Sequence, residues 1–126
     1  MMESARTPEP VNDFAATILV ITREGMGHAE PALQQKLLRT FPMLLLESAQ
    51  LPHAICFYTE GVRLVIDGSP MLDLLQSLKS KGVPLIVCQT CLNHFQISEK
   101  RRVGLVGGMG DIIAAMATAE KVITLS

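Results

Sequence analysis

The sequence contains few aromatic residues and no excess of positive charge. Aromatic residues make up only 4% of the chain, Trp is absent, and the formal net charge is -1 at pH 7. Proteins that bind nucleic acids usually present a basic face, and those that bind single strands stack bases on aromatic rings. We therefore expect no nucleic-acid partner.

Long apolar runs are also missing. No stretch approaches the roughly 20 apolar residues that cross a bilayer, and residues 1–17 show no apolar h-region of a secretory signal. The three cysteines are an odd number, which does not suit a disulfide framework. These absences predict a cytoplasmic protein with free thiols and no membrane partner.

The chain does have enough apolar residues for a well-packed core. Hydrophobic residues account for 48% of the 126 residues, which suits one domain of ordinary size. Residues 1–15 include two prolines, Asn12 and Asp13, and we expect them to form a flexible N-terminal tail. Residues 16–126 are predicted to form a single domain.

Apolar runs rich in β-branched residues alternate with helical patterns along this domain. Strands are predicted at 17–22, 53–59, 83–88, near Val103 and at 121–125. Helices are predicted from Pro31 to about Ser48, from Ser69-Pro70 to Gly82, around 90–91 and from about 111 to 119. Pro42 predicts a kink or break near residues 39–40, and residues 63–66 fit either a short strand or an ordered loop. The alternation predicts an α/β sandwich with a mostly parallel sheet.

Two cysteines lie where such a sheet gathers its reactive groups. Cys88 ends the third predicted strand, and Cys91 falls near the first turn of the next helix. Ligands bind outside the carboxyl ends of parallel strands, and a helix N-terminus favours a thiolate. Two thiols at this spacing can exchange a sulfur atom or a disulfide, which predicts a nucleophilic or sulfur-carrying site. Burial in the core is the alternative for either thiol, and the preferred interpretation of Cys56, in the middle of a strand.

Other patterns leave further interpretations open. Cys88, Cys91 and His94 offer three zinc ligands, with a fourth to be recruited from His28 or His53. A thioredoxin-like motif is also conceivable. The glycine-bearing stretches 24–28 and 104–111 could hold an anion or simply allow tight turns, and the basic run 100–102 could attract an anionic donor or remain a solvated turn.

The sequence resembles the DsrE/DsrF-like (TusD-related) sulfur-relay family, most nearly the C-terminal domain of YedF-type sulfurtransferase-like proteins. Three blocks carry the resemblance: GMGHAE, TEGVRLVIDGSPMLDLLQSLKSKGV and CQTCL. The closing segment GDIIAAMATAEKVITL is also similar. The resemblance covers most of residues 17–125. It implies a three-layer α/β/α sandwich with a mainly parallel five-stranded sheet.

The resemblance also implies a function and partners. A cysteine accepts persulfide sulfur from a donor protein and passes it to an acceptor, with no metal and no cofactor. Cys88 matches the sulfur-accepting cysteine of the family, and Cys91 matches the second cysteine of the YedF-type motif, whereas the helix-end argument favours Cys91. Homo-oligomers, often built on trimers, are implied. Because YedF-type proteins carry an additional TusA-like domain, the donor here is expected to be a separate protein, such as a TusA-like carrier.

Two hypotheses from different classes follow. The first is a small cytoplasmic sulfur carrier, a possible sulfurtransferase acting through Cys88 and Cys91. The second is a non-catalytic oligomeric module that binds a small anion or nucleotide at a glycine-lined strand edge. In either case an interface between copies is expected at Leu44–Leu46 or at the apolar part of residues 60–69, unless both simply pack on the sheet.

Overall fold

A computed structural model of the protein describes residues 11–126. Most of the predicted tail therefore lies outside the described residues. The elements are, in chain order, β1 (Thr17–Ile21), α1 (Pro31–Glu47), β2 (Ala54–Phe57), the 3-10 helix η2 (Thr59–Val65), α2 (Leu72–Ser80), β3 (Leu85–Cys88), α3 (Gln89–His94), the 3-10 helix η3 (Ser98–Lys100), β4 (Leu105–Gly107), α4 (Met109–Thr118) and β5 (Lys121–Leu125).

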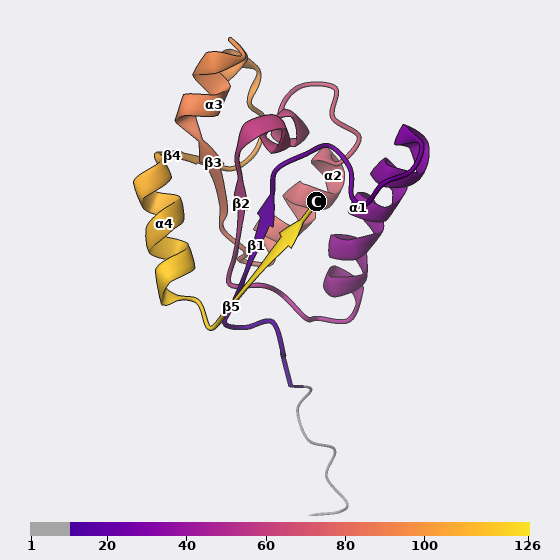
Figure 1. The fold of residues 1–126 in the computed structure, drawn as a ribbon. Coiled ribbons are helices and arrows are strands. Elements are labelled where there is room, and N and C mark those ends of the chain that lie inside the picture. Colours follow the sequence, from indigo (N-terminus) through magenta and orange to yellow (C-terminus); the bar gives the residue numbers. More distant parts are fainter. Residues whose placement is uncertain (1–10) are drawn as a thin grey trace, which may run out of the picture.

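The five strands form one sheet in the order β4-β3-β2-β1-β5, and every neighbouring pair is parallel. The connections from β1 to β2 and from β2 to β3 run in the same direction, so α1 and α2 share one face of the sheet. The connection from β4 returns across the sheet to β5, and α4 lies on the side opposite α1 (Figure 1). The predicted α/β sandwich with a parallel five-stranded sheet is confirmed.

The core is built around β1, which lies between β2 and β5 in the sheet. All five of its residues are buried, which explains why its sequence is a continuous apolar run rather than an alternating one. Leu38 and Leu45 of α1 and the leucine stripe of α2 cover one face, while α4 buries only Ile112. No helix within residues 11–126 is both long and apolar enough to cross a membrane.

The break predicted at Pro42 is wrong. Helix α1 continues through this residue as a single segment of 17 residues. Pro42 cannot donate to the carbonyl one turn earlier, but its ring is among the buried residues of α1, and this packing offsets the lost hydrogen bond. A proline that packs into the core therefore does not end the helix.

Two other boundaries differ from the sequence pattern. Helix α2 begins at Leu72 rather than at Ser69-Pro70, because the Ser69 hydroxyl accepts a hydrogen bond from the Met71 amide at 3.1 Å and closes a turn before the helix. Residues 63–66, which fitted a strand or a loop, belong mostly to the 3-10 helix η2. Only Ile66 pairs as an extended residue, in an isolated bridge to Arg101.

The described part of the predicted tail, residues 11–15, contacts the loop after α1. The Asn12 side chain donates to the Leu51 carbonyl at 2.8 Å, and the Asp13 amide donates to the Gln50 side chain at 2.8 Å. Phe14 packs against the core. These contacts tie the chain to the sheet several residues before β1 begins.

Candidate functional site

The two cysteines of the C-x-x-C motif lie at the carboxyl edge of the sheet, as the sequence predicted. Cys88 is the last residue of β3 and the N-cap of α3, and Cys91 is the third residue of that helix. Only 1% of Cys88 is exposed, whereas Cys91 is partly exposed. Solvent and protein partners can therefore reach Cys91, while Cys88 is packed beneath it.

A backbone amide from the neighbouring strand points at the Cys91 sulfur. The Thr59 N–H, just past the end of β2, donates to Cys91 Sγ across 3.1 Å. Thr59 has a φ of 48°, a left-handed conformation that is a genuine outlier for a β-branched residue. Such a conformation costs about 1–3 kcal/mol and persists only where surrounding contacts enforce it. We take this strained residue as part of the site.

Two contacts hold Thr59 in this conformation. Its hydroxyl donates to the Thr22 carbonyl at 2.7 Å, which ties it to the end of β1. Two residues later, Gly61 packs so closely on β1 that an added Cβ would lie 2.0 Å from the Ile21 carbonyl oxygen. The start of η2 is thus pressed onto the carboxyl ends of the central strands, and the Thr59 amide has a fixed direction.

The surroundings of Cys91 shift its pKa upward. Burial is the largest cause, the neighbouring Cys88 thiol adds to it through a hydrogen bond and through charge repulsion, and the Thr59 amide acts in the opposite direction. The expectation of an acidified thiol at a helix end is therefore wrong for Cys91, because partial desolvation outweighs the single N–H donor. Cys56 is fully buried in β2, as predicted, and burial raises its pKa to about 11.

Arg63 brings a positive charge to the same edge of the sheet. Its guanidinium lies 4.3 Å from the centre of the Phe95 ring, one residue after α3, and its Nε contacts Glu60 Oε2 at 2.6 Å. Phe95 in turn donates its amide to the Cys91 carbonyl. The arginine therefore links η2 to the end of α3 and encloses the segment that carries Cys91.

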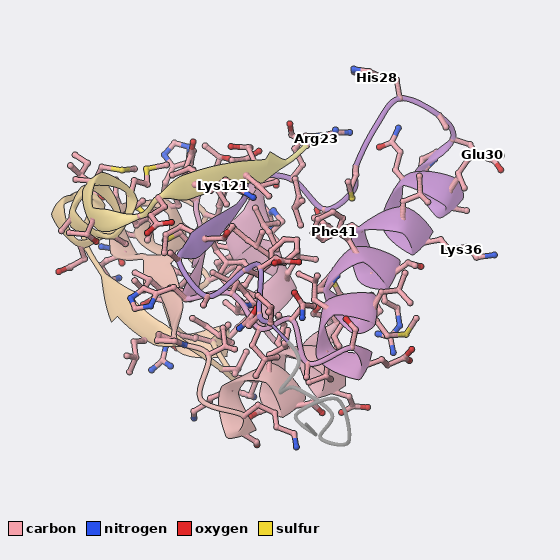
Figure 2. All side chains as sticks on the ribbon, turned by 90° about the horizontal axis from the view of Figure 1, so that it is seen from below. Arg23, His28, Glu30, Lys36, Phe41 and Lys121 are labelled. Carbon is pink, nitrogen blue, oxygen red and sulfur yellow. The ribbon has the colours of Figure 1, made fainter. Side chains whose placement is uncertain are left out.

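The structure does not bring together the ligands of the zinc interpretation. His53 precedes β2 and lies at the amino edge of the sheet, opposite to the cysteines. Figure 2 shows His28 at the tip of the loop between β1 and α1, pointing away from the body of the protein. Within residues 11–126, no three His, Cys, Asp or Glu side chains are grouped so that they could hold a metal ion.

The glycine-bearing stretches and the basic run have structural partners of their own. In the 104–111 loop, the Gly108 amide already donates to the Asp111 carboxylate at 2.9 Å, which places a negative charge where an anion would bind. Arg102 pairs with Asp67, with Nε and Oδ1 2.5 Å apart, and Arg101 donates to the Gly104 carbonyl. Neither feature contacts Cys91.

A cavity of about 400 Å³ lies between α1 and the segment leading into α2. Its lining is Glu24, Ala32, Gln35, Lys36, Arg39, Leu64, Pro70 and Met71. Neither cysteine lines it, and none of its lining residues is a glycine. Figure 2 shows Lys36 extending from α1 away from the sheet. This cavity is therefore not the glycine-lined anion pocket of the second hypothesis.

A comparison of the sequence with models of known families identifies the family of this chain. The DsrE/DsrF-like family profile matches residues 39–125, a range that includes Cys88, Cys91, η2 and the four strands that follow β1. The chain belongs to the DsrE/DsrF-like family. The resemblance to the DsrE/DsrF-like family is therefore confirmed, and no curated protein sequence matched the chain.

Solved structures confirm the DsrE-like fold. The ychN protein from E. coli is similar at a TM-score of 0.69 and 18% identity, covering 88% of this chain and 99% of that one. MTH1491 from Methanobacterium thermoautotrophicum, a protein of unknown function, is similar at a TM-score of 0.66 and 16% identity, covering 87% and 98%. BT1422 from Bacteroides thetaiotaomicron, also of unknown function, reaches 0.63 and 14%, covering 87% and 95%.

Thr59 is the residue of this DsrE-like site that sequence reasoning missed. Its side chain has no chemistry that marks it, because its amide and its backbone conformation are what act on Cys91. One signal was available: consecutive parallel strands are usually neighbours, so the residue after β2 falls beside the residues after β3. That rule alone would have placed Thr59 near the cysteines.

Proposed function

We propose that the protein is a sulfur carrier that holds a persulfide on Cys91. In the accepting step, the Cys91 thiolate attacks the outer sulfur of a donor persulfide, R–S–SH. A new S–S bond forms at Cys91, the donor S–S bond breaks, and the donor leaves as the thiolate R–S⁻. An acceptor thiolate then removes the outer sulfur from Cys91 in the same way, and Cys91 returns to its starting state.

The observation that supports this proposal is the partly exposed Cys91 thiol that receives the Thr59 N–H. A thiolate on Cys91 is a charged acceptor, and a hydrogen bond from an amide stabilises it in a partly desolvated site. Cys88 matches the family's accepting cysteine in sequence, but a donor protein cannot reach a side chain that is only 1% exposed. We therefore assign the carrier role to Cys91 and a supporting role to Cys88.

The proposal includes the compartment and the partners. All three cysteines are free, which suits a reducing cytoplasm. The donor and the acceptor are other proteins, and a TusA-like carrier is a fitting donor because it presents an exposed persulfide. Arg63, held over Phe95 beside Cys91, gives an anionic persulfide group a favourable approach.

We also propose that the protein forms homo-oligomers through the face that carries α4. Helix α4 exposes apolar side chains at Ile113, which is 58% exposed, and at Met109, and the two edge strands expose Leu105, Val106 and Val122. The alternative interface at residues 60–69 has less support, since Val62, Leu64 and Val65 are buried in the core. A second copy of the chain is the simplest partner to cover the α4 face.

The carrier role is tested by incubating variants that each lack one of the three cysteines with a small persulfide. Cys88→Ala, Cys91→Ala and Cys56→Ala proteins are incubated with glutathione persulfide without oxygen, separated from it, alkylated and digested. We expect Cys88→Ala to gain one sulfur on the peptide that contains Cys91, and Cys91→Ala to gain none. Cys56→Ala is the matched control, because it removes a buried thiol outside the site.

Each result decides between the hypotheses. Sulfur gained at Cys88 in the Cys91→Ala protein would contradict the assignment to Cys91 and support the sequence alignment instead. Failure of every variant to gain sulfur would overturn the carrier role. The non-catalytic binding module would then be tested by calorimetry with phosphate and a nucleotide, using Arg39→Ala to disrupt the cavity.

A further inference from the structure

Cys88 and Cys91 occupy two positions of α3 whose side chains meet. Cys88 is the N-cap, with an extended backbone (φ −70°, ψ 116°), and Cys91 is the third residue of the first turn. These two positions, the N-cap and N3, belong to the same first turn of the helix, so their side chains start from neighbouring points of the backbone. The Cys88 thiol is close enough to Cys91 to raise the pKa of its thiol.

The two thiols differ in what can reach them. Cys91 is partly exposed, so an external sulfur donor has access to it. Cys88 is 1% exposed and belongs to the hydrophobic core cluster, so the reactive group that it can meet is the side chain of Cys91. An accessible thiol backed by a buried one is the arrangement of an attacking thiol and a resolving thiol.

We propose that Cys88 resolves the persulfide on Cys91 and releases its outer sulfur as hydrosulfide. This inference rests on the proposed carrier role of Cys91. The Cys88 thiolate attacks Cys91 Sγ, a bond forms between the two cysteine sulfurs, and the bond from Cys91 Sγ to the outer sulfur breaks. The electron pair leaves with the outer sulfur as HS⁻, and the proton of Cys88 passes to water.

The step balances without an external oxidant. The outer sulfur is reduced from the sulfane level to sulfide, and the two cysteine thiols are oxidised to a disulfide. A dithiol reductant, of the thioredoxin class in a cell or dithiothreitol in a test tube, then reduces the disulfide and resets the protein. With such a reductant the protein converts persulfides into thiols and sulfide, which is an activity beyond the transfer of sulfur to an acceptor.

Burial decides which sulfur Cys88 attacks. Attack on the outer sulfur would leave a persulfide on Cys88, a larger and ionisable group at a site that is 1% exposed and surrounded by apolar side chains. Attack on Cys91 Sγ leaves a compact, neutral disulfide in the same place and sends the charge out as a soluble ion. The packing at the end of β3 therefore favours release over relay when no acceptor protein is bound.

The test compares sulfide release with sulfur retention in the same samples. Wild-type, Cys88→Ala and Cys56→Ala proteins are reduced, freed of reductant and given glutathione persulfide without oxygen. Sulfide is trapped with monobromobimane, and intact mass reports a retained sulfur or the loss of two hydrogens to a disulfide. We expect wild type and Cys56→Ala to release one sulfide per chain and form the disulfide, and Cys88→Ala to keep the sulfur on Cys91 and release almost none.

The outcomes separate this inference from the carrier role. If Cys88→Ala keeps a sulfur on Cys91 and wild type also keeps it, with no disulfide, resolution by Cys88 is overturned while the carrier role stands. If Cys88→Ala gains no sulfur, the carrier role itself fails. Circular dichroism checks the fold, and Cys88→Ser provides a second variant of nearly the same size should the alanine protein be unstable.

Discussion

The amide of Thr59 and the sulfur of Cys91 lie 3.1 Å apart, although 32 residues separate them in the chain. Their contact joins the end of β2 to the first turn of α3 across the sheet edge. Because Thr59 adopts a left-handed conformation to make it, the contact is maintained against a conformational cost. The geometry identifies the N–H donor as the group that partly offsets the desolvation of the Cys91 thiolate.

Replacing Thr59 separates the roles of its amide and its hydroxyl. Thr59→Val keeps the β-branch at a positive φ but loses the bond to Thr22, so the amide shifts and one hydrogen bond to the thiolate is lost. A loss of about 1 kcal/mol corresponds to about fivefold slower alkylation of Cys91 by iodoacetamide at pH 8. Thr59→Gly adopts the same φ without strain and keeps the rate within about twofold of wild type. Equal rates in Thr59→Val and wild type would show that the hydroxyl bond to Thr22 is not needed to hold the amide against Cys91.

The alkylation rate of Cys91 should depend on pH in a way set by its raised pKa. Only the thiolate reacts, so in wild type we expect the rate to reach half of its maximum above about pH 8.5, which is the midpoint for an ordinary thiol. Cys88 raises the pKa of Cys91, and Cys88→Ala therefore moves the profile to lower pH and speeds alkylation at neutral pH. Peptide mass spectrometry assigns the modified cysteine. A wild-type profile that levels off near pH 7 would contradict the desolvated site.

The sequence was informative where one physical rule dominated. Buried parallel strands require continuous apolar runs, and β1, β2 and β3 lie within one or two residues of those runs. The same rule placed Cys88 at the carboxyl edge, since the position of a strand end fixes the position of the residue that follows it. The order of the strands and the returning connection to β5 were not predicted, because the handedness of crossovers alone does not fix which strands are neighbours.

Features that depend on tertiary contacts could not be predicted in this way. Whether Pro42 breaks α1 depends on how its ring packs, and whether residues 59–65 form a strand or a 3-10 helix depends on the approach of Gly61 to Ile21. The predicted direction of the Cys91 pKa shift was wrong because it also depends on tertiary contacts, which bury the thiol. The helix position of a thiol can be predicted from its neighbours in sequence, but its desolvation by η2 cannot.

The exposed α4 face predicts a specific effect on assembly. Ile113→Lys places a charge in the middle of the proposed interface, and we expect it to turn an oligomeric wild type into a monomer in light-scattering chromatography. Leu44→Lys is the matched control, because Leu44 is 53% exposed on α1, on the other side of the sheet. Loss of the oligomer in Leu44→Lys but not in Ile113→Lys would assign the interface to α1 instead.

Gly61 should tolerate no side chain. A Cβ at this position would lie 2.0 Å from the Ile21 carbonyl oxygen, which belongs to the backbone of the buried strand β1 and cannot move aside. We expect Gly61→Ala to lower the free energy of unfolding by about 2–4 kcal/mol in urea titrations, and to slow Cys91 alkylation by displacing Thr59.

Gly110→Ala is the control, since nothing lies within 4 Å of its added Cβ. In helix α4 this change should be neutral or stabilise by about 0.5–1 kcal/mol. Equal stability of the two variants would show that η2 can lift away from β1.

The buried thiol of Cys56 predicts how stability changes in alkaline solution. Its pKa is raised to about 11 by burial, whereas the same thiol titrates at about 8.5 in the unfolded chain. Below the unfolded value both states hold the proton, so its stabilising contribution is complete. As pH rises from about 8.5 to 11, the unfolded chain ionises first and this contribution is lost, at a cost of order 2 kcal/mol.

Cys56→Ala lacks the titration, so the free energy of unfolding of wild type should fall more steeply with pH than that of the variant. Urea unfolding at a series of pH values with a reductant present measures both slopes, and parallel slopes would mean that the Cys56 thiol ionises as readily in the folded protein as in the unfolded chain.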